Sequence, residues 1–369
     1  MLHSNFLALR CANRVGHERM KSEYGNFQDP LGLLQRMLLS KDRAARSALY
    51  RAASGMMLQP LDLLLEYFER KKLQEAKFSN LPMIFIVGAP RSGTTLFYQT
   101  LARFLPVAYF TNWSALFPRA PITATLAAKR FLSAKHFNDR SFYGNVAGLA
   151  APNDGFQVWN RWLGTDRYRA QQQISEAAQR EMRVFFNAWC AALQLPFLNK
   201  NNRNTDCVAL LASIFSNAYF IEVRRHPVYV AQSLLLARLR IQGSKEIGWG
   251  LRSSSGTPGK NYIDAVCEQI FEIEMKLRVD KIKVQPRHYI EISYEAFCAN
   301  PVAFVQRIGQ EILNQASDAA VLRRRLQPFV VTNTPRLAPE EYEKIRARIG
   351  ELYEADRLAE FEIASRAAA

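Results

Sequence analysis

One short loop in the sequence carries residues well suited to bind an anion. In GAPRSGTT (88–95), four residues separate two glycines, and the loop joins an apolar run to a helical pattern. Glycines let a backbone fold tightly around an anion, and the first N–H groups of the following helix, near Gly93, Thr94 and Thr95, would point at it with the positive end of the helix dipole. The spacing therefore predicts an oxyanion site of the phosphate-binding-loop kind.

The residue types in this loop indicate which oxyanion it binds. A nucleoside-triphosphate loop continues with Lys after its second glycine, but Thr94 stands there. The cation of the loop is Arg91, and a later strand pattern ends in Arg224-Arg225, where a P-loop nucleotidase would place a metal-binding Asp. A nucleotide that needs no metal fits these residues better than a triphosphate with Mg²⁺. A kinase with a degenerate loop is the alternative.

A second pair of residues has the spacing of a phosphate site. In FIEVRRHPVYVAQS (220–233), a strand pattern, a turn and a helical pattern follow one another, and Ser233 stands eight positions after Arg225. Across a turn and the first turns of a helix, this separation brings a guanidinium and a hydroxyl to the same helix start. The pair is therefore a second predicted anion site.

Together these motifs resemble those of the sulfotransferases that use 3′-phosphoadenosine-5′-phosphosulfate (PAPS). PRSGTT after an apolar strand is similar to their 5′-phosphosulfate loop, in the Arg-containing version of many bacterial enzymes and of tyrosylprotein sulfotransferases. Their 3′-phosphate site pairs an Arg, usually in Arg-Asp-Pro, with a Ser eight residues later, as Arg225 and Ser233 do here, although His226 replaces the Asp. Segments 197–215 and 292–308 are also similar to family segments.

The resemblance implies in-line transfer of a sulfuryl group from PAPS to a hydroxyl or amine, with release of adenosine 3′,5′-bisphosphate and without a metal. It implies that Arg91 neutralises the charge growing on the leaving phosphate. It also implies that Ser92, Gly93, Thr94 and Thr95 hold the 5′-phosphate through N–H and hydroxyl groups. Arg225 and Ser233 would bind the 3′-phosphate.

Two residues are candidates for the general base of this reaction. Asp154 lies in the loop PNDG, before the aromatic segment FQVWNRW, and His136 is the one His between the two predicted anion sites. Either could take the proton of the acceptor, and we favour Asp154. N-capping of the following helix explains Asp154 equally well, and an ordinary surface position explains His136.

These sites need a scaffold of alternating strands and helices. The apolar run at 83–87 predicts a strand buried on both faces, and 217–223 and 287–293 repeat the strand pattern before helical sequence. We therefore predict an α/β fold with a P-loop-like parallel sheet flanked by helices. Its expected parts are a helical N-terminal extension at 1–80, a sulfotransferase-like α/β domain at 81–336 and a C-terminal helical segment at 337–369.

Composition narrows the class of partner. With 49 Lys and Arg against 33 Asp and Glu, the net charge of +16 favours anionic partners. Five scattered cysteines indicate a reducing compartment, and no apolar run approaches the about 18 residues of a membrane span. We expect a cytoplasmic enzyme with a small-molecule, carbohydrate or lipid-linked acceptor, no nucleic-acid partner, and membrane contact at the surface at most. A basic polyanion-binding protein without catalysis is the second alternative. Oligomeric state is left open.

Overall fold

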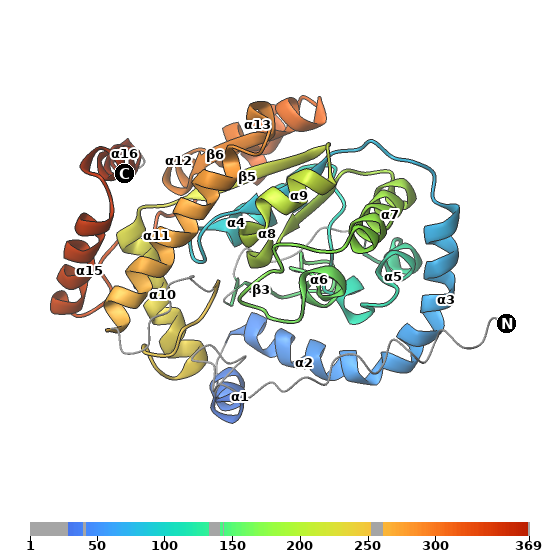
Figure 1. Cartoon of the computed structure of the whole chain (residues 1–369), viewed down its shortest axis with the longest axis horizontal. Helices are drawn as coiled ribbons and strands as arrows, with labels where there is room; N and C mark the ends of the chain where they lie inside the picture. The colour runs from blue at the N-terminus through green and yellow to red at the C-terminus, as the bar shows by residue number, and fades with distance from the viewer. Residues whose placement is uncertain (1–28, 40–41, 133–140, 143, 252–260, 368–369) are drawn as a thin grey trace.

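A parallel sheet of four strands forms the centre of the molecule (Figure 1). The computed structural model describes residues 29–39, 42–132, 141–142, 144–251 and 261–367. The strand order is β4-β1-β5-β6, and each neighbouring pair is parallel. The strands are β1 (Met83–Val87), β4 (Phe197–Lys200), β5 (Ala218–Arg224) and β6 (Tyr289–Ser293).

Both faces of the sheet are buried, because alternate residues of β1 enter two different cores. Phe85 packs against Trp159 and Phe197 in the core on one face, whereas Ile84 and Ile86 belong to the core on the other. The helices of the first face are α6 (Phe156–Leu163), α7 (Glu176–Leu193), α9 (Val208–Ile214), α10 (Pro227–Gln242) and α11 (Tyr262–Lys281). Those of the second face are α4 (Thr94–Phe104), α12 (Tyr294–Ala299), α13 (Pro301–Leu313) and α14 (Ala319–Arg325). The predicted α/β class with a buried parallel sheet is confirmed.

Helices also extend the chain at both ends. The described residues from 29 to 80, here named the N-terminal arm, contain α1 (Pro30–Leu39), α2 (Arg43–Met57) and α3 (Gln59–Glu75). This arm runs along the lower edge and one side of the molecule in Figure 1, and the C-terminal helices lie at the opposite end. The latter are α15 (Pro339–Leu352) and α16 (Ala355–Ala367). The predicted domain boundaries at 80/81 and 336/337 stay predictions.

Short elements connect these layers. They are η2 (Ser114–Leu116), α5 (Pro121–Ala128), β2 (Ser141–Phe142), β3 (Asn145–Val146), α8 (Asn202–Asp206) and η3 (Pro286–His288). The antiparallel pair β2–β3 lies beside α2. Within the described residues, no helix combines the length and the apolar composition that crossing a membrane requires.

The inner side of α3 carries two buried carboxylates beside the apolar side chains Leu65 and Leu73. Glu69 is 1% exposed and accepts hydrogen bonds from the N–H of Ile122 at 3.0 Å and from the N–H and Oγ1 of Thr123 at 2.8 and 2.7 Å. Asp62, also buried, accepts bonds of 3.2 Å from two N–H groups just before α5. Burial raises the pKa of Glu69, while its bonds to Thr123 oppose that shift. Two carboxylates of α3 thus satisfy the free N–H groups at the start of α5.

Candidate active site

The loop between β1 and α4 has the tight backbone that the glycine spacing predicts. Gly88 and Gly93 have φ of 143° and 102°, in the left-handed half of φ/ψ space that favours glycine. A Cβ on Gly93 would lie 2.3 Å from the ring of Tyr294, so no larger residue fits there without a rearrangement. Arg91 has φ of 76°, a conformation that costs a non-glycine residue about 1–3 kcal/mol and is concentrated at functional sites.

Buried polar groups hold this loop in place. The N–H of Gly88 donates to Oγ1 of Thr205 at 3.1 Å, and the N–H of Ser92 donates to the carbonyl of Ala89 at 3.1 Å. The hydroxyl of Ser92 is buried and has no hydrogen-bond partner among the described residues. A buried hydroxyl without a partner is unfavourable, and an oxyanion in the loop would supply one.

The two predicted anion sites meet at this loop. Nε of Arg91 donates to Oγ of Ser233 at 3.1 Å, although 142 positions separate the two residues. A guanidinium nitrogen of Arg225 donates to the carbonyl of Arg91 at 3.3 Å. The loop, the Arg and the Ser therefore lie together at the carboxyl ends of two neighbouring strands, β1 and β5.

Arg225 is fixed by further contacts with the segment after α14. Its guanidinium donates to the carbonyl and Oγ1 of Thr332 at 3.0 and 3.1 Å and to Oδ1 of Asn333 at 2.9 Å, and it lies 4.6 Å from the centre of the Tyr294 ring. Burial lowers the pKa of Arg225, with Tyr294 and Glu295 opposing. Such a buried, oriented guanidinium suits a multiply charged anion.

A cavity of about 670 Å³ opens beside the loop and has two kinds of wall. Its polar wall includes the loop, the first turn of α4 with Thr94 and Thr95, and Arg225. Its apolar wall is supplied by the N-terminal arm, through Leu33, Met37, Leu49, Ala52 and Met56. This role of the arm was not predicted, because the helical periodicity of the arm does not show which part of the molecule the arm covers.

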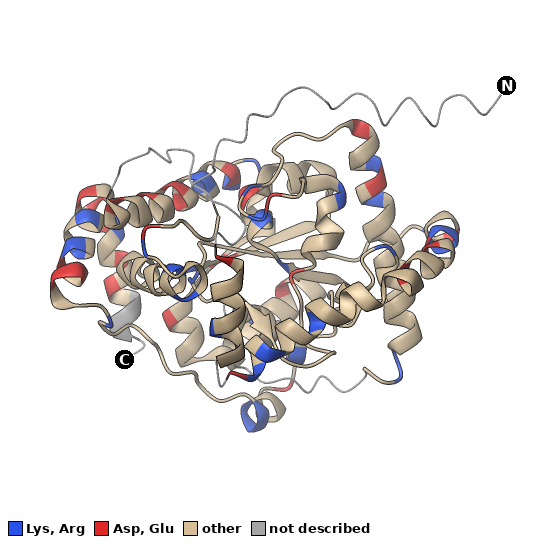
Figure 2. Ribbon diagram, turned by 90° about the horizontal axis from the view of Figure 1, so that it is seen from below, with Lys and Arg blue, Asp and Glu red and all other residues tan. Residues whose placement is uncertain are grey.

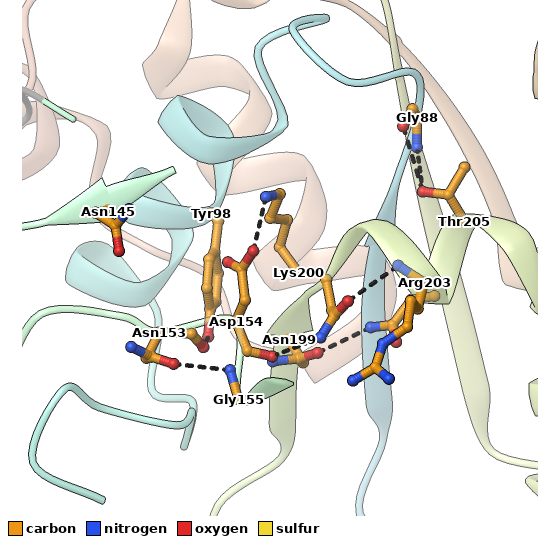
Figure 3. Close-up of polar contacts among 12 residues, drawn as sticks. Gly88, Tyr98, Asn145, Asn153, Asp154, Gly155, Asn199, Lys200, Arg203 and Thr205 are labelled. Atoms are coloured by element: carbon orange, nitrogen blue, oxygen red, sulfur yellow. Dashed lines mark hydrogen bonds and ion pairs between the residues drawn. The ribbon is translucent and has the colours of Figure 1, made fainter. Parts of the chain in front are cut away.

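Asp154 lies in this cavity and is paired with Lys200 at the end of β4. Nζ of Lys200 donates to Oδ2 of Asp154 at 3.1 Å, and both side chains are largely buried (Figure 3). The carbonyl of Asp154 accepts bonds from the side-chain amides of Asn201 at 3.0 Å and Asn199 at 3.4 Å. The N-cap explanation of Asp154 is wrong, because the cap of α6 is Gly155, and Asp154 faces Lys200 instead.

Arg51 is a site residue that the sequence analysis missed. It projects from α2 and donates to Oδ1 of Asn112 at 2.7 Å and Oδ1 of Asn145 at 2.6 Å. Burial lowers the pKa of Arg51, and the charge of Asp154 opposes this shift. No local motif marks an arginine within an Ala- and Leu-rich helix as a site residue.

The other predicted base is His136. His136 falls in the segment 133–140, which lies outside the described residues. The segment 243–251 after α10 is irregular, and its Trp249 and Gly250 line the cavity, whereas residues 252–260 lie outside the described part.

Comparison with known proteins gives a consistent result. A model of the sulfotransferase family matches residues 82–312. Two curated relatives, the omega-hydroxy-beta-dihydromenaquinone-9 sulfotransferases Stf3 of Mycobacterium bovis and Mycobacterium tuberculosis, are each 24% identical over 256 residues, which are 63% of this chain and 62% of theirs. The chain thus spans about three fifths of the length of these relatives.

Solved structures show the same fold at low sequence identity. Sulfotransferase STF9 from Mycobacterium avium is similar with a TM-score of 0.53 and 13% identity, over 87% of this chain and 89% of that one. Sulfotransferase STF1 from Mycobacterium tuberculosis has a TM-score of 0.51 and 13% identity, over 87% and 91% of the two chains. These likenesses confirm the predicted P-loop-like fold class.

Proposed function

Because the chain belongs to the sulfotransferase family, we propose that it transfers a sulfuryl group from PAPS to a hydroxyl or amine of its acceptor and releases adenosine 3′,5′-bisphosphate. The observation that carries this proposal is the meeting of the two anion sites, with Arg91 hydrogen-bonded to Ser233 and Arg225 to the loop carbonyl. Two separate cationic sites in one cavity suit a nucleotide that carries phosphate at both its 3′ and 5′ positions.

The residues of the loop would hold the 5′ end of the nucleotide. Ser92, Gly93, Thr94 and Thr95 offer N–H and hydroxyl groups, and the partnerless hydroxyl of Ser92 is one donor ready for this role. Arg91 would neutralise the charge that grows on the leaving phosphate as its bond to sulfur breaks. Arg225 and Ser233 would bind the 3′-phosphate from the other side of the same loop.

Asp154 would serve as the general base. In the proposed step, an acceptor oxygen or nitrogen attacks sulfur, the bond from sulfur to the bridging oxygen of the phosphate breaks, and the acceptor's proton passes to the carboxylate of Asp154. Lys200, whose Nζ lies 3.1 Å from Oδ2 of this carboxylate, would hold the base in place and adds a positive charge to this part of the cavity.

The acceptor would be at least partly apolar. Leu, Met and Ala side chains of α1 and α2 line one part of the cavity, although Arg51 of α2 lines it too. The curated relatives are named for a dihydromenaquinone, a lipid-like acceptor. Of the expected acceptor classes, a lipid-linked one fits this part of the cavity best. A cytoplasmic location stays a prediction.

Binding measurements would test the proposed nucleotide. Calorimetric titration should show binding of adenosine 3′,5′-bisphosphate without added metal and little binding of ATP with Mg²⁺. Incubation with ³⁵S-labelled PAPS and fractionated cell extract should then label an acceptor. A preference for ATP with Mg²⁺ would contradict the proposal and favour the kinase alternative. Binding of PAPS without transfer to any fraction would favour the non-catalytic polyanion-binding alternative.

We expect Asp154→Asn to lower the transfer rate by about 10²–10⁴-fold, the usual contribution of a general base. Affinity for adenosine 3′,5′-bisphosphate should change little, because Asp154 is assigned to the acceptor side. Single-turnover transfer of ³⁵S would measure the rate, and Asp356→Asn is the matched control, since Asp356 is an exposed carboxylate on α16. A full rate in Asp154→Asn would assign the base elsewhere, with His136 the next residue to replace.

A further inference from the structure

The outer side of α3 carries large apolar side chains, while two carboxylates of the same helix are buried. Leu64, Tyr67 and Phe68 are 68%, 72% and 53% exposed, whereas the carboxylates Asp62 and Glu69 of the same helix are buried. A helix on a soluble protein normally turns its apolar stripe to the core and its charges to water. The inner side of α3 bonds to the start of α5 and also packs Leu65 and Leu73 on the core, and the remaining large apolar side chains face outward.

The apolar outer surface continues along the whole N-terminal arm. Of the 22 large apolar side chains that are exposed in the described part of the chain, 13 lie in this arm, which is a small fraction of the molecule. They are Leu31, Leu34, Leu38, Leu39, Tyr50, Met56, Met57, Leu61, Leu63, Leu64, Tyr67, Phe68 and Phe78. Single exposed apolar residues are ordinary, but a concentration of this size on one segment marks an interaction surface.

The exposed charges on the arm are mostly positive, although Arg70 pairs with Glu66 at 2.6 Å and Lys71 with Glu75 at 3.9 Å. Among the charged residues of the arm that are exposed, five are basic and one, Glu75, is acidic. The basic ones are Arg43, Arg46, Arg70, Lys71 and Lys77. Figure 2 views the molecule from the side on which α1 and α2 lie, with Lys and Arg in blue. Apolar side chains bordered by basic ones match a surface that is apolar within and anionic at its edge, as a bilayer with acidic headgroups is.

The same helices form the apolar wall of the cavity. Leu33 and Met37 of α1 and Leu49 of α2 line it, and Met56 both lines the cavity and is 66% exposed. At Met56 the exposed apolar surface of the arm and the lining of the cavity therefore share a side chain. A protein partner with a polar interface does not explain why the exposed apolar surface reaches the cavity. An apolar acceptor does, because it could move along this surface from a bilayer to the nucleotide end of the cavity.

We propose that the outer surface of the N-terminal arm docks on an anionic lipid bilayer. The helix α3 would lie along the interface, with Leu64, Tyr67 and Phe68 in the acyl region and the exposed basic residues of the arm nearest to them beside the phosphates. That the acceptor then enters the cavity from the bilayer at Met56 rests on the proposed function; the docking itself does not.

Vesicle flotation of the full chain tests the docking. We expect binding to vesicles of phosphatidylcholine and phosphatidylglycerol in equal amounts, and weaker binding to phosphatidylcholine alone or at high salt. The triple variant Leu64→Glu, Tyr67→Glu, Phe68→Glu should lower the bound-to-free ratio by about tenfold or more, since three apolar side chains would no longer enter the acyl region. The matched control Val279→Glu, Ile282→Glu, Val321→Glu replaces three exposed apolar residues of α11–α14 and should stay within about twofold of the unmodified chain.

Titration with adenosine 3′,5′-bisphosphate, repeated on all three proteins, reports folding and the nucleotide site independently of lipid. Vesicle binding that is absent from the unmodified chain, or equal in the two triple variants, overturns the docking proposal. A dimer that the α3 variant dissociates, in a chain that does not bind vesicles, also overturns it and assigns the surface to a second copy. If the unmodified chain does not bind adenosine 3′,5′-bisphosphate, the proposed function is contradicted instead, whatever the result with vesicles.

Discussion

Replacing Arg91 by alanine is expected to slow sulfuryl transfer by about 10²–10³-fold, the usual cost of removing one donor that stabilises developing charge. The side chain points from a backbone of unfavourable φ to Oγ of Ser233, and the carbonyl is held by Arg225. This arrangement keeps the guanidinium at the point where the loop and the second anion site meet. Affinity for adenosine 3′,5′-bisphosphate should fall less than the rate, because the other loop donors still hold the 5′-phosphate.

Two further variants make this measurement specific. Arg91→Lys keeps the charge but loses the planar fork of the guanidinium, so its rate should lie between those of the alanine variant and the unmodified chain. Arg346→Ala is the control, since Arg346 is exposed and pairs with Glu343 at 3.2 Å on α15. Rates should be read from single-turnover transfer of ³⁵S at saturating PAPS. If Arg91→Ala transferred at the unmodified rate, the charge on the leaving phosphate would have to be neutralised by another residue.

The second large effect is expected from Gly93→Ala. The new Cβ would lie 2.3 Å from the ring of Tyr294, and the φ of 102° would become strained for a residue with a side chain. The loop would have to shift, which moves the N–H groups at the start of α4 away from the phosphate. We expect affinity for adenosine 3′,5′-bisphosphate to fall by about 10²-fold or more, together with a loss of about 1–3 kcal/mol in the free energy of unfolding.

Gly350→Ala is the matched control for this substitution. Gly350 lies inside α15, and a Cβ there would meet no atom within 4 Å, so alanine should keep the nucleotide affinity and slightly raise stability through its better helix propensity. Calorimetric titration and urea denaturation of both variants would separate local distortion from an effect of any Gly-to-Ala change. Equal nucleotide affinity in the two variants would mean that the backbone of Gly93 does not shape the phosphate site.

Local sequence determined the parts of the site that lie within one loop or one strand–helix unit. The glycine spacing at 88–93 predicted the tight backbone, because φ is limited by the residue itself. The spacing of Arg225 and Ser233 placed both near this loop, where each of them contacts Arg91. The buried strand at 83–87 was also predictable, since both faces of a continuous apolar run have to be shielded from water.

Tertiary structure alone decided which distant residues meet. Asp154 pairs with Lys200 because β4 lies beside β1, and Arg51 reaches the cavity because the arm folds back over it; strand order and the path of a helix arm depend on packing across the whole chain. The periodicity of α3 predicted a helix but not its orientation. Its two buried carboxylates accept N–H groups at the start of α5, a contact that the pattern does not show, and Leu64, Tyr67 and Phe68 face outward.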